Sequence, residues 1–274
     1  MLLAVEYLGE VGVGVTAPHF FRADNGHIYV VKLKNNRLGP TVLVSEYVAA
    51  RLGHILGLCF PPSDLIHLSS EFILQTPLFS SGVDPGLHFA SRYLTPTQHL
   101  TKETLSLASN VNEMAGVLLF DHMFHNLDHI SNKRNLLLHR EETGFKIYSI
   151  DNSHLFKGGR WTVAKLDKLA RKTKIYTQGL FRVLLNDFLA VQDFLPYLDN
   201  ANNLTDPLIT ELVQDIPAEW LTEEDERAAL IRHIQARRDI AGQLFHKLLK
   251  HIPTSRGGTK TFTPRVIRHT LKTK

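Results

Sequence analysis

The segment NLDHISNKRNLLLH places carboxylate, amide and cationic side chains directly before an apolar run. Two β-rich runs, 135–139 and 145–150, are joined by a Glu-Glu-Thr-Gly turn. Pairing of these runs as a hairpin brings the entry of the first near the exit of the second. We therefore expect Asp128, Asn135 and Asp151 to converge. Two carboxylates with an amide oxygen suit a hard cation such as Mg²⁺, and such sites usually serve phosphate chemistry.

A candidate phosphate-binding set lies upstream. Lys32 falls in YVVKLK, within the second strand of an expected hairpin, and Glu46 follows fourteen positions later on the next expected helix. Kinases use a strand lysine paired with a helix glutamate to hold the α- and β-phosphates of ATP. Gly12 and Gly14, in GEVGVGVTAP, would let the backbone approach phosphates closely. The order of these elements indicates a nucleotide site.

Several segments together resemble the HipA-like kinase family, bacterial relatives of the protein-kinase fold. They are YVVKLKNNRLGP, SEYVAARLGHILGL, GLHFASRYL, MAGVLLFDHMFHNLDH, RNLLL, YSIDNSHLF, IPAEWL and ARRDI, in the family's order over roughly residues 8–250. The resemblance implies an α+β, two-lobed protein-kinase-like fold with a small β-rich N-lobe and a larger, mainly helical C-lobe. It also implies ATP-dependent, Mg²⁺-assisted phosphoryl transfer, most often to protein serine or threonine. Family members can act as toxins with a partner antitoxin.

The resemblance also implies roles for individual residues. Asp128 would orient the acceptor hydroxyl, and Asn135 and Asp151 would bind the metal. Lys32, supported by Glu46, would hold phosphates. The connector backbone would meet the adenine. The residues expected around the nucleotide are Gly12, Gly14, Lys32, Glu46, Phe89, Ala90, Ser91 and Arg92.

The catalytic loop departs from the usual kinase spacing. The loop asparagine normally lies five positions after the aspartate, where this chain has Lys133. Asn132 lies at plus four and Asn135 at plus seven. We favour Asn135 because it abuts the following strand, and Asn132 stays the alternative. His129 stands where an arginine is common, and Asp-Asn-Ser stands where protein kinases carry Asp-Phe-Gly.

Two other functions fit parts of the sequence. A catalytically silent kinase-like module would bind nucleotide or a partner without transferring phosphate, which the irregular loop suggests. A His/Asp metallohydrolase would use His122 and His125, which are three positions apart on one helix face and could ligate Zn²⁺ or Fe²⁺. No second ligand pair has diagnostic spacing. His129 and His154 flank the proposed carboxylates and could contact phosphate or substrate.

The N-lobe is expected over residues 1–88. Asp24-Asn25-Gly26 predicts the turn of a hairpin. Apolar spacing from Thr41 predicts an amphipathic helix that ends at Gly57. A short strand is expected over 64–68. Residues 69–88 contain several turn formers and predict a long loop.

The connector is expected over residues 89–96 and the C-lobe over 97–253. The C-lobe turns helical from Lys102, and a long charged helix is expected from Thr222 to about His251. Residues 254–274 are expected to form a flexible basic tail, with six cations and no acid: Arg256, Lys260, Arg265, Arg268, Lys272 and Lys274.

The composition of the 274 residues sets the broad class. With 43% hydrophobic and 21% charged residues, the chain is typical of soluble globular proteins. No apolar run approaches the roughly 20 residues of a membrane span, and a signal peptide is not expected. A single cysteine, Cys59, fits a core position in a reducing cytoplasm. Apart from the tail, which could contact nucleic acid or an acidic partner, nothing indicates a nucleic-acid-binding fold.

Overall fold

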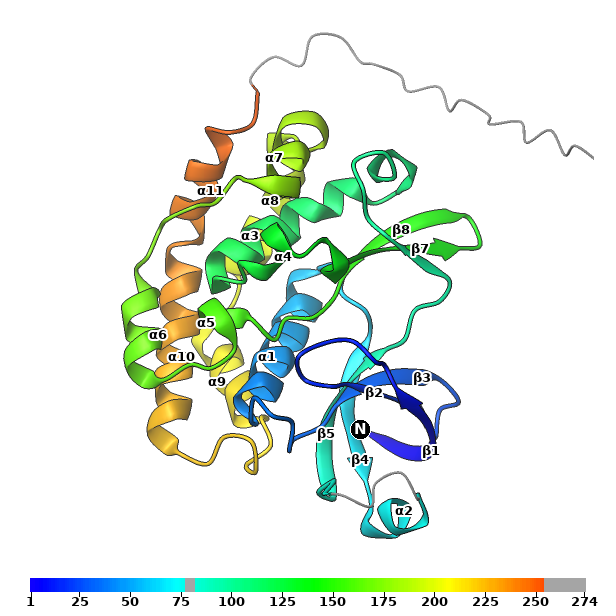
Figure 1. Cartoon of the computed structure of the whole chain (residues 1–274). Coiled ribbons are helices and arrows are strands. Elements are labelled where there is room, and N and C mark those ends of the chain that lie inside the picture. Colours follow the sequence, from blue (N-terminus) through cyan, green and yellow to red (C-terminus); the bar gives the residue numbers. More distant parts are fainter. Residues whose placement is uncertain (77–81, 254–274) are drawn as a thin grey trace, which may run out of the picture.

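The computed structural model describes residues 1–76 and 82–253 of the chain. Its amino-terminal part is a closed barrel with the strand order β1-β2-β3-β5-β4 (Figure 1). Alternate residues of the strands point inward, so that apolar side chains such as Phe21 and Val31 fill the barrel. The strands are β1 (Leu2–Glu10), β2 (His19–Ala23), β3 (Ile28–Lys32), β4 (Ser63–Leu68) and β5 (Gly86–Arg92).

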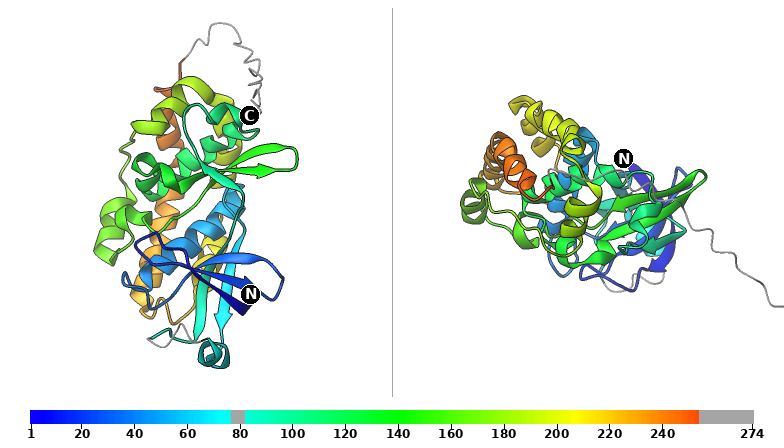
Figure 2. Two further views of the ribbon diagram at one scale, coloured as in Figure 1. Left: turned by 45° about the vertical axis from the view of Figure 1, so that its right-hand side comes forward. Right: turned by 90° about the horizontal axis from the view of Figure 1, so that it is seen from above.

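Helices make up most of the rest. α10 and α11 lie on the side of the molecule away from β1–β3 (Figures 1 and 2). The helices are α1 (Thr41–Leu56), α2 (Ser70–Gln75), α3 (Met114–Phe124), α4 (Asp128–Ser131), α5 (Leu155–Gly158), α6 (Val163–Ala170), α7 (Gly179–Val183), α8 (Val191–Asn202), α9 (Asp206–Gln214), α10 (Glu224–Asp239) and α11 (Ala241–Leu249). Shorter turns are η2 (Leu105–Leu107), η3 (Val111–Glu113), η4 (Lys133–Asn135) and the π-helical η5 (Leu184–Phe188).

Helix α1 joins the barrel to the helical part. It follows β3 in the chain, but its buried apolar residues belong to the large core that it shares with the later helices. Gly57 ends the helix in the left-handed region, with φ 72°, and its N–H donates to the carbonyls of Gly53 and His54. Because the helix is buried along most of its length, Glu46 is held on a packed surface, not in solvent.

A second sheet positions the polar segment that follows α3. Its order is β6 (Thr97–His99), β7 (Leu136–Glu141) and β8 (Gly144–Ser149). The expected hairpin is present, with Leu136 paired to Ser149. One step beyond this pair, the Ile150 N–H donates to the carbonyl of Asn135 at 2.9 Å. The two ends of the hairpin therefore bring the residues before β7 close to those after β8.

The amino-terminal part differs from the expectation in three places. A strand that was not expected, β1, precedes the Gly-rich segment, which therefore connects β1 to β2. The expected loop 69–88 contains α2, whose start is capped because the Ser69 hydroxyl accepts from the Phe72 N–H at 3.0 Å. The boundary at residue 88 falls inside β5, which pairs with both β3 and β4 and is thus an integral barrel strand.

The helical part differs in two places. Between Lys102 and α3 the chain forms 3₁₀ turns, because the Asn110 side chain binds the N–H and carbonyl of Ile147 and ties this stretch to β8. The expected helix 222–251 is two helices that separate at Ile240, since α10 packs mainly on α6 and α9 whereas α11 packs on α8 and α3.

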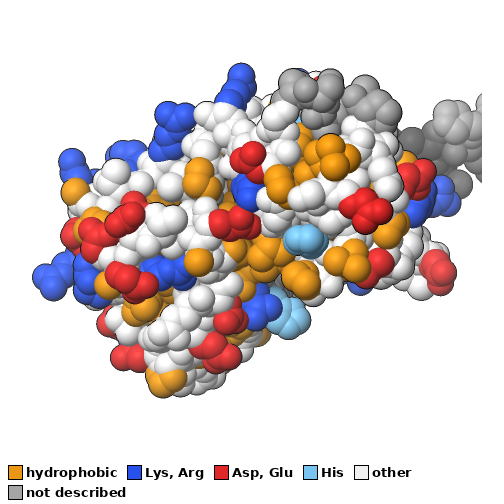
Figure 3. Space-filling view, turned by 90° about the horizontal axis from the view of Figure 1, so that it is seen from below, with side chains coloured by type: hydrophobic (Ala, Val, Ile, Leu, Met, Phe, Trp, Pro, Cys, Tyr) orange, Lys and Arg blue, Asp and Glu red, His pale blue; other side chains and the backbone are white. Residues whose placement is uncertain are grey.

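On the face drawn in Figure 3, apolar side chains are scattered among acidic and basic ones. Within residues 1–76 and 82–253, no helix is both long enough and apolar enough to span a bilayer. Cys59 is buried in the helical core. The basic tail at 254–274 lies outside the described residues.

Candidate active site

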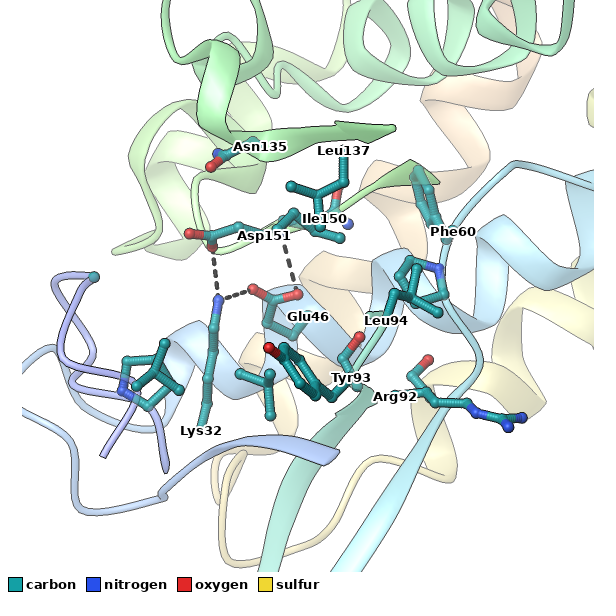
Figure 4. A pocket seen from close by; sticks show the side chains of 18 of the residues that line it. Lys32, Glu46, Phe60, Arg92, Tyr93, Leu94, Asn135, Leu137, Ile150 and Asp151 are labelled. Atoms are coloured by element: carbon teal, nitrogen blue, oxygen red, sulfur yellow. Dashed lines mark hydrogen bonds and ion pairs between the residues drawn. The ribbon is translucent and has the colours of Figure 1, made fainter. Parts of the chain in front are cut away.

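Lys32, at the end of β3, makes two ion pairs at the centre of the site (Figure 4). Its ammonium group donates to the carboxylate of Glu46 and, at 2.6 Å, to Oδ1 of Asp151. Burial alone would lower the pKa of Lys32, but the carboxylates of Asp151 and Glu46 raise it above its usual range. The lysine is therefore a fixed positive charge that links β3, α1 and the segment after β8.

Asp151 is held in an unusual backbone conformation. Its φ of 60° is in the left-handed region, which side-chain-bearing residues seldom adopt and which often marks functional sites. The Ser153 hydroxyl donates to Asp151 Oδ1 at 2.6 Å. Burial would raise the pKa of Asp151, but the Lys32 ammonium and Ser153 hold it well below its usual range. Next to it, the Asn152 N–H donates to Glu46 at 3.2 Å.

Asp128 begins α4 and is joined directly to the loop asparagines. Asn135 Nδ2 donates to Asp128 Oδ2 at 2.7 Å. Asn132 Nδ2 donates to Asn135 Oδ1 at 3.1 Å and lies 3.4 Å from Asp128 Oδ2. His154 Nδ1 approaches the same carboxylate at 3.7 Å. Both asparagines thus belong to one network, and the choice between them as metal ligand stays a prediction.

A cavity of about 750 Å³ lies between the barrel and the second sheet. Its polar end includes Lys32 and Asp151, and apolar side chains such as Phe60, Leu137 and Ile150 form another part of its wall (Figure 4). Of the residues expected from the sequence, those lining it are Gly14, Lys32, Glu46, Phe89, Ser91, Arg92, Asn135 and Asp151. Gly12, Ala90 and Asp128 are outside this lining. A cavity that is mostly apolar, with a few convergent charges, suits a nucleotide-sized ligand.

The stretch expected to bind adenine is mostly barrel strand. Residues 89–91 of β5 are paired with β3 on one side and β4 on the other, so their backbone groups are used in strand pairing. Ala90 is fully buried in the barrel core, because alternate residues of a strand face opposite sides. Tyr93 and Leu94, which follow the strand, also line the cavity. Tyr93 could have been identified by continuing the alternation of Phe89 and Ser91, whereas Leu94 has the opposite parity and gave no such signal.

His129 is buried beneath the site and does not line the cavity. It is fully buried, so the expectation that it contacts phosphate or substrate is wrong. Its Nδ1 lies 2.8 Å from Asp121 Oδ2 and its Nε2 lies 3.0 Å from the Ile150 carbonyl. Burial would lower the pKa of His129, but the Asp121 carboxylate raises it to about 9. The His129 ring binds the backbone carbonyl of Ile150, the residue before Asp151. Asp121 and His129 together therefore position Asp151.

The histidines of the metallohydrolase alternative are structural. His122 Nδ1 lies 2.6 Å from the Leu118 carbonyl, and its Nε2 accepts from the Tyr176 N–H at 3.0 Å. His125 is buried and ends α3 with φ 54°. Among the described residues, no group of three or more His, Cys, Asp or Glu side chains could hold a metal ion. The structure therefore offers no support for a zinc or iron centre on this helix.

Three buried histidines should make stability depend on pH. Burial lowers the pKa of His88 to about 4, of His125 to about 3 and of His233 to about 4. In the unfolded chain each titrates near pH 6.5. Between that pH and about 4, the unfolded state binds protons that the folded state does not, so stability falls as the pH falls. We expect a loss on the order of 1 kcal/mol per histidine and per pH unit.

Denaturant unfolding at about pH 7 and about pH 5 measures this loss. His125→Asn should reduce the pH dependence, because asparagine does not titrate and tolerates the positive φ at this position. His54→Asn, at an exposed position on α1, is the matched control and should leave it unchanged. An equal pH dependence in wild type and His125→Asn would contradict the assignment.

Comparison with known proteins places the chain among kinases. A family model described as HipA-like kinase matches residues 4–244. No curated protein sequence matches significantly. Among solved structures, the Helicobacter pylori proinflammatory kinase CtkA is similar with a TM-score of 0.57 and 15% identity, covering 92% of this chain and 98% of that one. At this identity the likeness concerns the fold, which is a kinase-like α+β fold.

Two further structures are more distant. Hydra Fam20 with sugar has a TM-score of 0.48 and 14% identity, covering 91% of this chain and 86% of its own. The Golgi casein kinase with Mn/ADP bound has a TM-score of 0.46 and 11% identity, covering 91% and 72%.

Proposed function

The chain belongs to the HipA-like kinase family and is a kinase, and on this premise we propose that it transfers the γ-phosphoryl group of ATP, with Mg²⁺, to a serine or threonine hydroxyl of a protein. The observation that carries this proposal is the double ion pair of Lys32 with Glu46 and Asp151 in the wall of a nucleotide-sized cavity. In the proposal, the ammonium group of Lys32 meets the phosphates and the neighbouring carboxylate of Asp151 binds the metal.

Each part of the site has a role in the proposal. Lys32 holds phosphates, with Glu46 fixing its position. Gly14 lines the cavity at the Gly-rich segment, and Gly12, two residues before it, has the positive φ of 77° that glycine adopts without strain. The apolar wall and the end of β5, Phe89 to Arg92, receive the base together with Tyr93 and Leu94.

The oxygen donors fit a hard divalent cation. The Asp151 carboxylate and the Asn135 amide both line the cavity, and carboxylate and amide oxygens are the ligands that Mg²⁺ takes. Bound there, the metal would neutralise phosphate charge. Asp128, hydrogen-bonded to Asn135, orients the acceptor hydroxyl, so that positioning and charge neutralisation carry the transfer without a covalent intermediate.

The proposed lobes, localisation and partners are those that the family resemblance implies. The barrel to Arg92 forms the N-lobe, residues 93–96 the connector, and residues 97–253 the C-lobe, with ATP between them. The protein acts in the bacterial cytoplasm, where its single cysteine stays reduced. Its partners are a protein acceptor and an antitoxin-like regulator.

Calorimetric titration of ATP into the wild-type protein, with and without Mg²⁺, tests the nucleotide site. ADP and phosphoprotein are measured in the same samples. Saturable Mg²⁺-dependent binding with formation of both products supports a kinase that transfers phosphate to protein. Binding without either product favours the catalytically silent module, the alternative that the irregular spacing of the catalytic loop suggests. Absence of binding overturns the proposal.

A further inference from the structure

The segment that follows Asp151 is strongly cationic. Residues 152–174 contain one acid, Asp167, and seven basic residues: Lys157, Arg160, Lys165, Lys168, Arg171, Lys172 and Lys174. The ion pairs within residues 1–76 and 82–253 involve none of these seven side chains. Their charge is therefore not neutralised by ion pairs within the described part of the chain.

Two of these cations connect the segment to the Gly-rich segment. Arg160 Nη2 donates to the Arg37 carbonyl at 3.1 Å, and Lys165 Nζ donates to the Arg160 carbonyl at 2.8 Å. Arg37 in turn donates through Nε to the Val15 carbonyl at 2.5 Å. Gly14, the neighbour of Val15, lines the cavity. Arg160 and Lys165 are therefore joined through Arg37 to the Gly-rich segment beside the cavity.

The start of the segment also approaches the proposed catalytic aspartate. His154 lies 3.7 Å from Asp128, and three residues later Lys157 starts the cationic run in α5. The run continues along α6, which packs on α10 (Figure 1). Arg160 and Lys157 are exposed. An acceptor that presents a hydroxyl to Asp128 would therefore lie near His154 and the start of this run.

The close spacing of these cations has an electrostatic cost. Burial and the nearby Lys157 lower the pKa of Lys165. Like charges held together without counter-ions raise the local potential, and an anionic ligand relieves it. A stacking platform for nucleic-acid bases is missing here, because the large exposed hydrophobic side chains of the described residues include one aromatic, Tyr93, which lines the cavity instead.

We propose that the cationic face formed by Lys157, Arg160, Lys165, Lys168 and Arg171 docks an acidic segment of the protein acceptor beside the phosphorylated hydroxyl. This inference rests on the proposed function and adds the substrate class to it. Carboxylates of the acceptor would meet cations that form no ion pair with the described acids, which favours acceptors whose serine or threonine is flanked by aspartate or glutamate.

Fluorescence anisotropy with a labelled peptide tests the surface independently of catalysis. The probe is a serine peptide flanked by Asp and Glu, and its twin carries Asn and Gln at the same positions. A single-stranded oligonucleotide is the third probe. The full-length test variant is Lys157→Gln/Arg160→Gln/Lys165→Gln. The second test variant is Lys168→Gln/Arg171→Gln, which removes none of the hydrogen bonds described above. It keeps the test decisive if the triple variant fails to fold.

The matched control removes three cations elsewhere that are at least partly exposed, Arg51→Gln/Lys102→Gln/Lys146→Gln. We expect the acidic peptide to bind more tightly than its twin, both test variants to weaken it, and the triple variant to do so by about tenfold, as for loss of several rim charges. The control should bind as wild type. Equal binding of the two peptides, or no loss in either test variant, overturns the inference, and so does tighter binding of the oligonucleotide.

Phosphate transfer from ATP to the bound peptide is then measured separately. Preferential phosphorylation of the acidic peptide, lost in the test variants, supports both proposals. If the acidic peptide binds through the cationic face but no phosphoserine forms on any peptide, the docking surface stands and the proposed function fails. If both peptides are phosphorylated at equal rates, the proposed function stands and the docking inference fails.

Discussion

Replacement of Asp128 by asparagine should lower phosphoryl transfer by about a hundredfold to ten-thousandfold, the usual contribution of a group that orients or deprotonates a nucleophile. The affinity for Mg-ATP should remain close to that of wild type. Asp128 is outside the lining of the cavity, where the proposal has it orient the acceptor hydroxyl, and it accepts a hydrogen bond from Asn135. Asparagine is nearly the same size and its amide oxygen can accept that bond, so the loop should keep its shape while the charge is lost.

Initial rates of phosphoprotein formation, together with calorimetry of ATP binding, separate these two effects. Asp225→Asn, at an exposed position in the first turn of α10, removes the same charge far along the chain and is the matched control. It should leave both the rate and the affinity unchanged. Normal transfer by Asp128→Asn would show that another group orients the acceptor, and weakened ATP binding would place Asp128 among the metal ligands instead.

Replacement of Asp151 by alanine should act on binding itself. Asp151 is an ionised carboxylate in the cavity wall, and its loss removes the proposed metal ligand as well as one of the two partners of Lys32. We expect the affinity for Mg-ATP to fall by about tenfold or more, which corresponds to at least about 1.4 kcal/mol. The fold should persist, because Lys32 stays paired with Glu46.

The informative quantity is the gain in ATP affinity that Mg²⁺ provides. Wild type should bind ATP more tightly with the metal than without it, and Asp151→Ala should lose most of this difference. Ser153→Ala is a useful companion, because it removes a hydrogen bond to Asp151 but keeps the carboxylate. It should retain the metal effect. A full Mg²⁺ effect in Asp151→Ala would exclude this aspartate as the ligand, and Asn135 would then be examined alone.

The family and much of the site follow from local patterns. The turn at Asp24-Asn25-Gly26, the helix capped by Gly57 and the hairpin after Asn135 are each specified by neighbouring residues. Such signals depend on backbone preferences over a few positions, which a single sequence displays directly. The sequence therefore determined, by itself, the order in which Lys32, Glu46 and the later acids occur.

Only the tertiary structure decided which side chains are exposed and which backbone N–H and C=O groups are not used in strand pairing. The sequence could not show that β5 pairs on both sides, because strand order depends on contacts between distant segments. Nor could it show that His129 turns inward to Asp121, since a histidine after a catalytic aspartate fits either face of a loop. The allocation of α1 to the helical core and the separation of α10 from α11 likewise depend on packing partners far along the chain. Long-range packing is a property of the whole chain, and local preference does not encode it.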